Sequence, residues 1–306
     1  MPTASIVPSP GGSPLAANMA CVASMLVWAV GFPVADELLK VLPPIAIATL
    51  RLSMAALALL PFWYLSDAGR EWRSAAWARA LVIGAMGSGI SALLLIYAQE
   101  RTDGITIAVI FAAMPIAGIA LECLFDGRRL TWRLIAGIIL STIGGIAVYG
   151  ARMGHLNMGL GALSALVSVV IFAWGARTSV KALPDLSALG RTTITLTGGA
   201  IVAVVVQAFL DLTGSAAVPW HLIGAREWLY LAIYGVGSLA IAQLLFLTGV
   251  ATLGVAVATM HHNVAPFYVM VFSLAFGAGW NWGQVAAAAL VVLGVIVAQG
   301  RGNRAP

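Results

Sequence analysis

The residues best suited to bind a solute form a polar cluster near the C-terminal end of the chain. Thr259, His262, Asn263 and Pro266 stand at i, i+3, i+4 and i+7 in an otherwise apolar run. This spacing places them on one face of an α-helix. Polar side chains on such a run avoid lipid, so the face should point to protein or to a water-filled cavity. The alternative is that these side chains only hydrogen-bond neighbouring helices.

A second polar set comes from two segments with a similar local pattern. Ser88 and Ser91 are three residues apart beside glycines, and Ser238 and Gln243 lie in the later segment. The serine hydroxyls are suited to donate to a substrate carboxylate. Small side chains in this arrangement would equally suit close helix packing, and the sequence leaves both interpretations open.

Aromatic residues stand at helical spacing in two further segments. Met25 and Trp28 belong to one stripe, and Ser168 and Trp174 belong to another. Both tryptophans lie deeper than segment ends, so we expect them to stack on a solute or gate a cavity, with ordinary packing as the alternative. Phe111 occupies the position that corresponds to His262 in an internal repeat described below. One polar and one apolar wall would suit an amphipathic substrate.

The acidic residues lie where they could not meet a solute at membrane depth. All eleven fall in loops or at the ends of apolar segments: Asp36, Glu37, Asp67, Glu71, Glu100, Asp103, Glu122, Asp126, Asp185, Asp211 and Glu227. A proton-coupled pump usually has an ionisable group at depth, and an exporter of cationic drugs needs a buried carboxylate. We therefore expect a facilitator for neutral or zwitterionic solutes. His262, whose imidazole titrates near neutral pH, makes a proton-coupled exporter the alternative.

Two other classes of function find less support. An intramembrane enzyme would need a nucleophile beside a base, or at least three metal ligands, and the adjacent His261 and His262 point apart on a helix. A channel would show a selectivity filter or a ring of charge. We predict no catalytic residue, no metal and no cofactor.

The composition determines the solvent in which these residues must be positioned. The 306 residues are 61% hydrophobic and 9% charged, with a mean hydropathy of +0.99, whereas a soluble domain has about 25% charged residues. Apolar runs of about 20 residues cross a bilayer as helices, and continuous runs without alternation exclude a barrel. Ten spans are predicted, at 15–35, 44–65, 77–98, 104–123, 132–150, 158–178, 187–210, 227–247, 253–276 and 283–299.

The basic residues predict how these spans are oriented. With a cytoplasmic N-terminus, ten Lys and Arg fall in inside loops and four in outside loops, so both termini should be cytoplasmic and the protein a multi-pass protein of the cell (inner) membrane. The net charge of +5 is spread over loops and does not indicate nucleic-acid binding. Residues 1–14 and 300–306 are expected to form tails, the first without the basic region of a signal peptide.

An internal duplication organises the spans. The run GAMGSGISALLLIY at 84–97 resembles YGVGSLAIAQLLFL at 234–247, and the same offset of 150 pairs Trp132 with Trp282. Pro115 and Pro266 correspond within one residue, and both are candidate hinges or packing devices. Each half has five spans, and because five is odd, the second copy enters the membrane from the opposite side. Such inverted repeats allow a transporter to open alternately to each side.

The chain resembles the EamA domains of drug/metabolite transporters. The run LPPIAIATLRL with Arg51, then Pro115 and ECLFDGRRLTWRLIAGIILSTIGGIAVYG at 122–150, carry the resemblance in the first half. The second half matches through Trp174-Gly175, Arg191 and Pro266, although Gly277 to Gly283 lacks the acidic and basic residues. We expect Arg51 and Arg191 to snorkel or cap helices rather than bind substrate.

The resemblance implies a fold and a class of function. The fold is an all-α integral membrane protein in which two inverted five-helix EamA repeats, 15–150 and 158–299, surround a central cavity. The first, third and fourth helices of each repeat would line that cavity. Members export small metabolites, and the general similarity is to exporters of amino acids, including aromatic ones. The expected partners are a small-molecule substrate, the bilayer and, through the fifth helices, a second copy in a homodimer. The small-residue face Gly137, Ser141 and Gly144 suits either a dimer contact or an intramolecular one.

Overall fold

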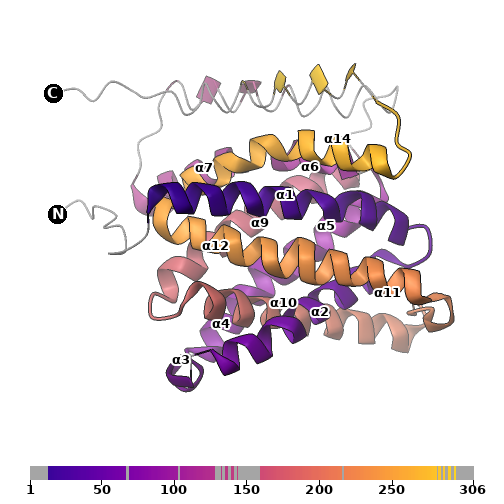
Figure 1. Cartoon of the computed structure of the whole chain (residues 1–306), viewed down its shortest axis with the longest axis horizontal. Coiled ribbons are helices and arrows are strands. Elements are labelled where there is room, and N and C mark those ends of the chain that lie inside the picture. Colours follow the sequence, from indigo (N-terminus) through magenta and orange to yellow (C-terminus); the bar gives the residue numbers. More distant parts are fainter. Residues whose placement is uncertain are drawn as a thin grey trace.

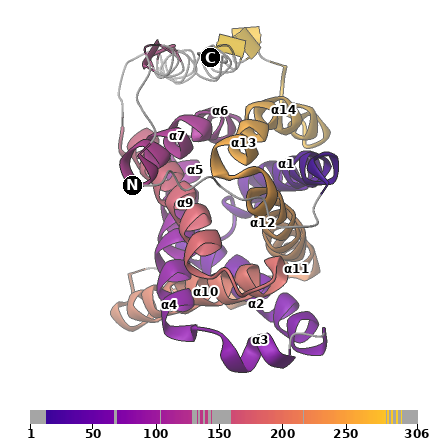
Figure 2. The same ribbon diagram turned by 90° about the vertical axis from the view of Figure 1, so that its left-hand side faces the viewer.

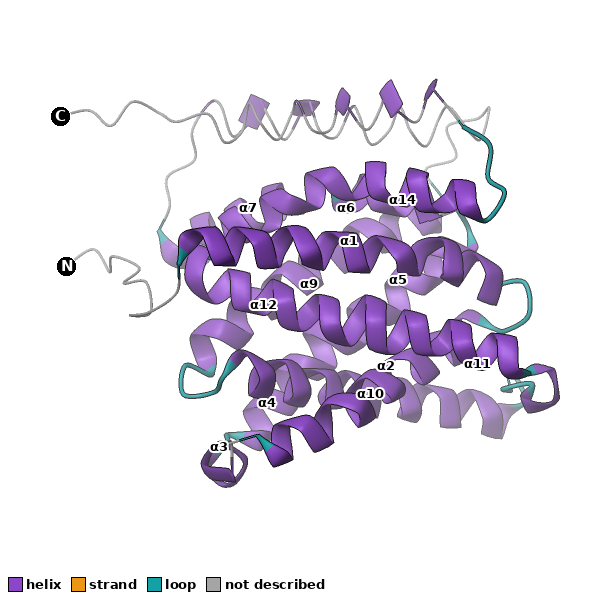
Figure 3. Cartoon of the chain, viewed as in Figure 1, coloured by secondary structure: helices purple, strands orange, loops and turns teal. Residues whose placement is uncertain are grey.

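The computed structural model describes residues 13–66, 69–102, 104–127, 159–215 and 217–280, together with isolated positions at 132–143 and 282–293. Throughout this described part, every element is helical (Figure 3). Eight helical segments in it are long and apolar enough to cross a membrane. Apart from those isolated positions, the expected spans 132–150 and 283–299 lie outside the described residues. So do nearly all of the expected tails 1–14 and 300–306.

The eight segments confirm the corresponding expected spans. They are Pro14–Leu38, Pro44–Leu65, Trp77–Glu100, Gly104–Asp126, Leu160–Ala182, Ala188–Thr213, Ala225–Leu253 and Val255–Ala275. Four are uninterrupted helices: α1 (Pro14–Leu38), α2 (Pro44–Leu65), α9 (Leu160–Ala182) and α10 (Ala188–Thr213). Short helices α3 (Gly69–Ser74) and η2 (Trp220–Leu222) lie between spans. Large apolar side chains such as Leu57, Phe62 and Val205 are exposed on the outside, as lipid contact requires. The chain is therefore a multi-pass membrane protein.

The other four spans change helix type or break partway. The third span consists of α4 (Trp77–Gly84), the π-helix η1 (Ala85–Ile90) and α5 (Ser91–Glu100). The seventh described span consists of α11 (Ala225–Ala232), the π-helix η3 (Ile233–Ile241) and α12 (Ala242–Leu253). The fourth consists of α6 (Gly104–Phe111) and α7 (Met114–Asp126), and the last of α13 (Val255–Thr259), the 3₁₀-helix η4 (Met260–Val264) and α14 (Ala265–Ala275). The two π-helices fall on the residues that the duplication pairs, Gly87-Ser88 and Gly237-Ser238.

Local sequence explains where several helices begin and end. Proline occupies the first turn of α1, α2, α7 and α14, where its missing N–H has no helical partner to lose. The Ser187 hydroxyl caps α10 by accepting from the Gly190 backbone N–H at 3.0 Å. The Glu122 carboxylate accepts from the Ala256 N–H at 3.3 Å, at the N-terminus of α13, where a negative charge is stabilised. Gly127 ends α7 with a φ of 69°, a conformation that glycine adopts readily.

The spans pack so that helices from the two halves of the sequence alternate as neighbours. Helix α1 packs against α12, α9 against α5, and α10 against α2, while α13 contacts α7. Figures 1 and 2 show this arrangement: in Figure 2, α1 and α12 lie on one side, α5 and α9 on the other, and α2 and α10 below them. The halves are also joined at their ends, where Arg177 pairs with Asp126 and Arg226 with Glu37.

One contact between η1 and α9 depends on two glycines. A Cβ added to Gly87 would lie 2.6 Å from the Gly175 Cα, whereas a Cβ added to Gly237, the position paired with Gly87, would meet nothing within 4 Å. Distances below 3.0 Å between a Cβ and backbone force the helices apart, and overpacking of this kind costs about 1–3 kcal/mol.

We therefore predict that Gly87→Ala lowers the thermal melting temperature of the detergent-purified protein, because the new methyl group collides with the α9 backbone. Gly237→Ala is the matched control and should melt at or above the wild-type temperature, since alanine favours helix by about 1 kcal/mol over glycine. Equal melting temperatures for Gly87→Ala and the wild type would contradict the close packing of η1 on α9.

Candidate functional site

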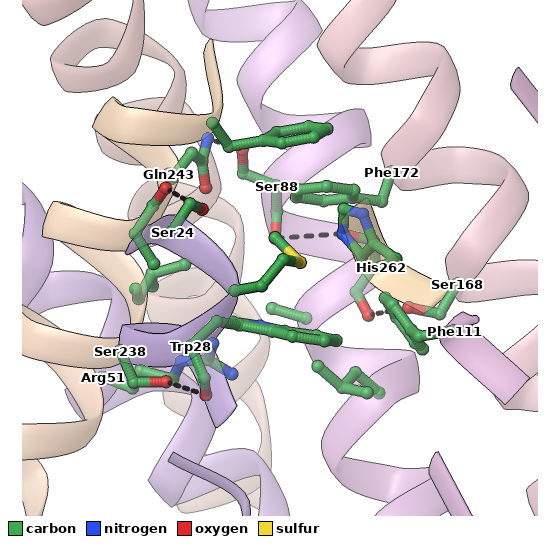
Figure 4. A pocket seen from close by; sticks show the side chains of 17 residues that line it. Ser24, Trp28, Arg51, Ser88, Phe111, Ser168, Phe172, Ser238, Gln243 and His262 are labelled. Atoms are coloured by element: carbon green, nitrogen blue, oxygen red, sulfur yellow. Dashed lines mark hydrogen bonds between the residues drawn. The ribbon is translucent and has the colours of Figure 1, made fainter. Parts of the chain in front are cut away.

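A cavity lies between the spans where the two halves of the chain meet. Its volume is about 50 Å³, and since one water needs roughly 10–15 Å³, it holds a few waters or a small chemical group. The polar lining residues are Ser24, Arg51, Ser88, Ser91, Ser168, Ser238, Gln243 and His262. The apolar ones are Met25, Trp28, Ala92, Leu95, Phe111, Phe172, Leu239, Ala242 and Phe246. They come from both halves of the chain, and Figure 4 shows many of them around the Trp28 ring.

Serine hydroxyls of the cavity wall join helices of the two halves. Ser24 on α1 donates to the Ala242 carbonyl at 2.6 Å, and Ser168 on α9 donates to the Ser91 carbonyl at 2.8 Å. Ala242 and Ser91 are the first residues after the π-helices η3 and η1. Each π-helix is thus fastened, at the same point, by a hydroxyl from a helix of the other half. Ser238 likewise donates to the Trp28 carbonyl at 2.9 Å.

Besides Arg51, two polar side chains of the cavity have a buried atom with no hydrogen-bond partner among the described residues. Gln243 donates to the Ser88 hydroxyl at 3.2 Å, but its buried Oε1 has no partner. The buried Nδ1 of His262 also has none. Buried polar atoms without a partner are rare in proteins, so these two atoms are available to a bound molecule or to water.

Aromatic rings form another large share of the lining. The Trp28 ring centroid lies 5.3 Å from that of Phe111 and 5.5 Å from that of His262, and His262 in turn lies 5.1 Å from Phe246. Phe172 stacks on Phe246 with centroids 6.0 Å apart. Rings at these separations attract one another and present flat apolar faces. The cavity therefore combines an aromatic part with a part rich in hydroxyl and amide groups.

Arg51 brings a positive charge to the cavity. The arginine is only 3% exposed. Its Nη1 donates to the Tyr234 hydroxyl at 2.8 Å, and its Cζ lies 3.9 Å from the Tyr234 ring centroid. Arg51 was expected to snorkel or to cap a helix; the snorkelling expectation is wrong, because Tyr234 of η3 holds the guanidinium inside the bundle. Arg191 is also buried, but it does not line the cavity.

The structure brings together nine of the twelve residues predicted to bind substrate. Those that line the cavity are Met25, Trp28, Ser88, Ser91, Phe111, Ser168, Ser238, Gln243 and His262. Trp174, Thr259 and Asn263 do not line it. Trp174 instead packs, partly buried, against the apolar core that contains Ile107 and Phe111.

The polar cluster of the last described span does not form one wall of the cavity. The expected common face assumed 3.6 residues per turn, but residues 260–264 form the 3₁₀-helix η4 with 3.0 residues per turn, which turns Asn263 farther from the direction of Thr259. His262 faces the cavity, whereas Thr259 donates to the Val255 carbonyl of its own helix at 2.8 Å, and Asn263 is buried away from the cavity. His261 approaches the Ala258 carbonyl at 3.1 Å. The expectation of a four-residue polar wall is therefore wrong.

The candidate hinge prolines both follow an interruption of their span. Pro115 lies in the first turn of α7, after the break between α6 and α7, and Pro266 lies in the first turn of α14, after η4. Each proline therefore starts a new helix and does not kink a continuous one. Their role as hinges stays a prediction.

Sequence reasoning missed several lining residues. Ser24 lies four residues before Trp28, and this spacing on one helix face could have identified it. Phe172 and Phe246 look like any other apolar residues of their spans. Arg51 was noticed, but its place next to an apolar helix end suggested a membrane-face role. Only its pairing with Tyr234, 183 residues later in the chain, explains its position.

The charges and ligands near the cavity restrict its chemistry. Among its lining residues in the described part of the chain, none is Asp or Glu. Within the same described residues, no three His, Cys, Asp or Glu side chains come together as metal ligands. The arrangement is that of a binding cavity with one cation, several hydroxyls and an aromatic face.

Comparisons with known proteins identify the fold and the family of the chain. A solved crystal structure superposes with a TM-score of 0.68 over 94% of this chain and 97% of that one, at 18% sequence identity, which shows a shared fold. The uncharacterized transporter YyaM of Bacillus subtilis (strain 168) is 25% identical over 225 residues, which are 72% of each chain. The model of the EamA-like transporter family matches residues 15–150 and again 159–299. Two copies of the same family domain thus cover almost all of the chain, and the protein belongs to the EamA-like transporter family.

Proposed function

We propose that this membrane transporter exports small neutral or zwitterionic metabolites, in particular amino acids and aromatic ones among them. The observation that carries this proposal is the lining of one cavity by both aromatic rings and hydroxyl groups, with no carboxylate on its described walls. An aromatic amino acid has groups that match both kinds of lining, since its ring is apolar and its backbone groups are polar. A cationic drug would find no negative partner there.

The proposed mechanism is alternating access between two inverted repeats. It is supported by the matched bonds at the ends of the π-helices, Ser24 to Ala242 and Ser168 to Ser91, which fasten equivalent points of the two halves. Two similar sets of contacts are what a molecule needs to adopt two states of similar energy. The cavity of about 50 Å³ is smaller than an amino acid, so the bundle must open to admit one. The inner membrane and cytoplasmic termini belong to the same proposal.

The proposal includes facilitated rather than proton-driven transport. His262 is the ionisable side chain of the cavity wall that could carry a proton in the alternative mechanism. Its ring is enclosed by Trp28 and Phe246, and no carboxylate of the described part of the chain is within salt-bridge distance of it. Such surroundings favour the neutral imidazole, since an unpaired buried charge is costly.

We predict that purified protein in proteoliposomes exchanges L-phenylalanine across the membrane without an imposed pH difference. A facilitator equilibrates its solute, so collapsing any proton gradient with an ionophore should leave the final internal level unchanged. Accumulation above equilibrium that appears only with a pH gradient, and that His262→Gln abolishes while exchange continues, would establish the proton-coupled alternative instead.

The paired tryptophans give a second prediction. Trp28→Ala should reduce phenylalanine exchange by about 5-fold, because it removes an aromatic contact worth roughly 1 kcal/mol from the cavity wall. Trp174→Ala is the matched control from the other half of the chain and should stay near the wild-type rate, as should Asn263→Ala. Equal losses in Trp28→Ala and Trp174→Ala, at equal expression, would show that the cavity described above is not the transport site.

A further inference from the structure

The charge of Arg51 has no counter-ion among the described residues of the bundle. The residue is 3% exposed, and no Asp or Glu oxygen of the described residues lies within salt-bridge distance of its guanidinium. Within the described residues its guanidinium donates a hydrogen bond to a neutral phenol, the Tyr234 hydroxyl, at 2.8 Å. Its buried Nε has no hydrogen-bond partner. A buried charge left without compensation costs several kcal/mol, so the site is incomplete as it stands.

The missing anion would have to come from the cavity. Arg51 lines it together with Ser91 and Ser238, and in Figure 4 Arg51 and Ser238 lie close to each other at one end of the Trp28 ring. Tyr234 holds the guanidinium through both the hydrogen bond and the contact of Cζ with its ring at 3.9 Å. A planar guanidinium fixed in this way matches the two oxygens of a carboxylate.

The second buried arginine has different surroundings. Arg191 is 8% exposed and its Nε is also without a partner, but the Glu71 carboxylate acts favourably on its charge, and Arg191 does not line the cavity. Glu71 is itself held by Ser187 and Trp63 at the surface end of the bundle. Of the two arginines, only Arg51 combines a place on the cavity wall with the lack of a protein anion.

We propose that Arg51 binds the carboxylate of the transported solute and so determines the specificity of transport. This inference rests on the proposed transport function and narrows the substrates to monocarboxylates. The apolar part of the solute lies against Trp28 and the other rings. Because no described lining residue is acidic, the ammonium group of an amino acid has no charged partner in the cavity. The carboxylate is therefore required for binding, and the ammonium group is not.

Matched ligand pairs test this requirement by thermal stabilisation of the detergent-purified protein at neutral pH. The pairs are L-phenylalanine with L-phenylalaninamide, 3-phenylpropionate with 3-phenylpropionamide, and L-leucine with L-leucinamide. Each acid should bind roughly 10- to 100-fold more tightly than its amide, since hydrogen bonds to charged groups contribute about 1.5–3 kcal/mol. 3-Phenylpropionate, which lacks the ammonium group, should bind within a few-fold of phenylalanine.

Variants locate the effect at Arg51. Arg51→Gln should bind acid and amide equally, Arg51→Lys should keep part of the preference, and Arg191→Gln, the matched control, should keep all of it. Equal binding of acids and amides by the wild-type protein would overturn the proposal, even if Arg51→Gln fails to fold, and so would an unchanged preference in Arg51→Gln. Binding of no member of any pair at millimolar concentration would also overturn it.

The same measurements separate this inference from the proposed function. If the acids bind preferentially and Arg51→Gln removes the preference, but proteoliposomes exchange no phenylalanine, the carboxylate site stands and export of aromatic amino acids is wrong. If phenylalanine is exchanged and phenylalaninamide competes with it equally, transport stands and the role of Arg51 is wrong.

Discussion

The requirement that every buried polar group find a partner within the protein determines most of this structure, because hydrocarbon supplies none. It explains why the serines of the interior bridge helices. Ser24 and Ser168 each donate to a carbonyl at the end of a π-helix in the other half of the chain. These bonds hold the halves together, and the same side chains line the cavity. The sequence left open whether serines in these spans pack helices together or line a binding wall. The structure shows that one serine can do both.

The spans and their ends could be predicted from sequence because the signals are local. Continuous apolar runs give the eight confirmed spans, and prolines such as Pro44 stand at the first turn of the helices they begin. Much of the cavity could be predicted for a similar reason. Trp28 and Ser88 lie on the inward faces of regular or nearly regular helix, where spacing translates into direction. The internal duplication added information, since it pointed to Ser238 through its similarity to Ser88.

The remaining features depend on contacts between distant parts of the chain or on departures from regular helix. The 3₁₀-helix η4 changes the direction of each side chain after Met260, so Asn263 leaves the face on which α-helical spacing placed it. The burial of Arg51 depends on Tyr234, and nothing near Arg51 in the sequence indicates that contact. Sequence spacing assumes one helical period throughout a span, and this molecule changes the period next to its cavity.

The differences between the two halves matter as much as their similarity. Both have a buried arginine early in the second helix and a tryptophan late in the first, yet only Arg51 and Trp28 line the cavity, while Arg191 and Trp174 do not. Two similar frameworks can support two states of similar energy. Unlike side chains on those frameworks give the cavity one arginine and several aromatic rings. In the transport proposed above, a solute with a carboxylate at one end would bind in a single orientation, because reversing it would leave Arg51 without an anion. Similar frameworks would then serve movement, and dissimilar side chains would serve recognition.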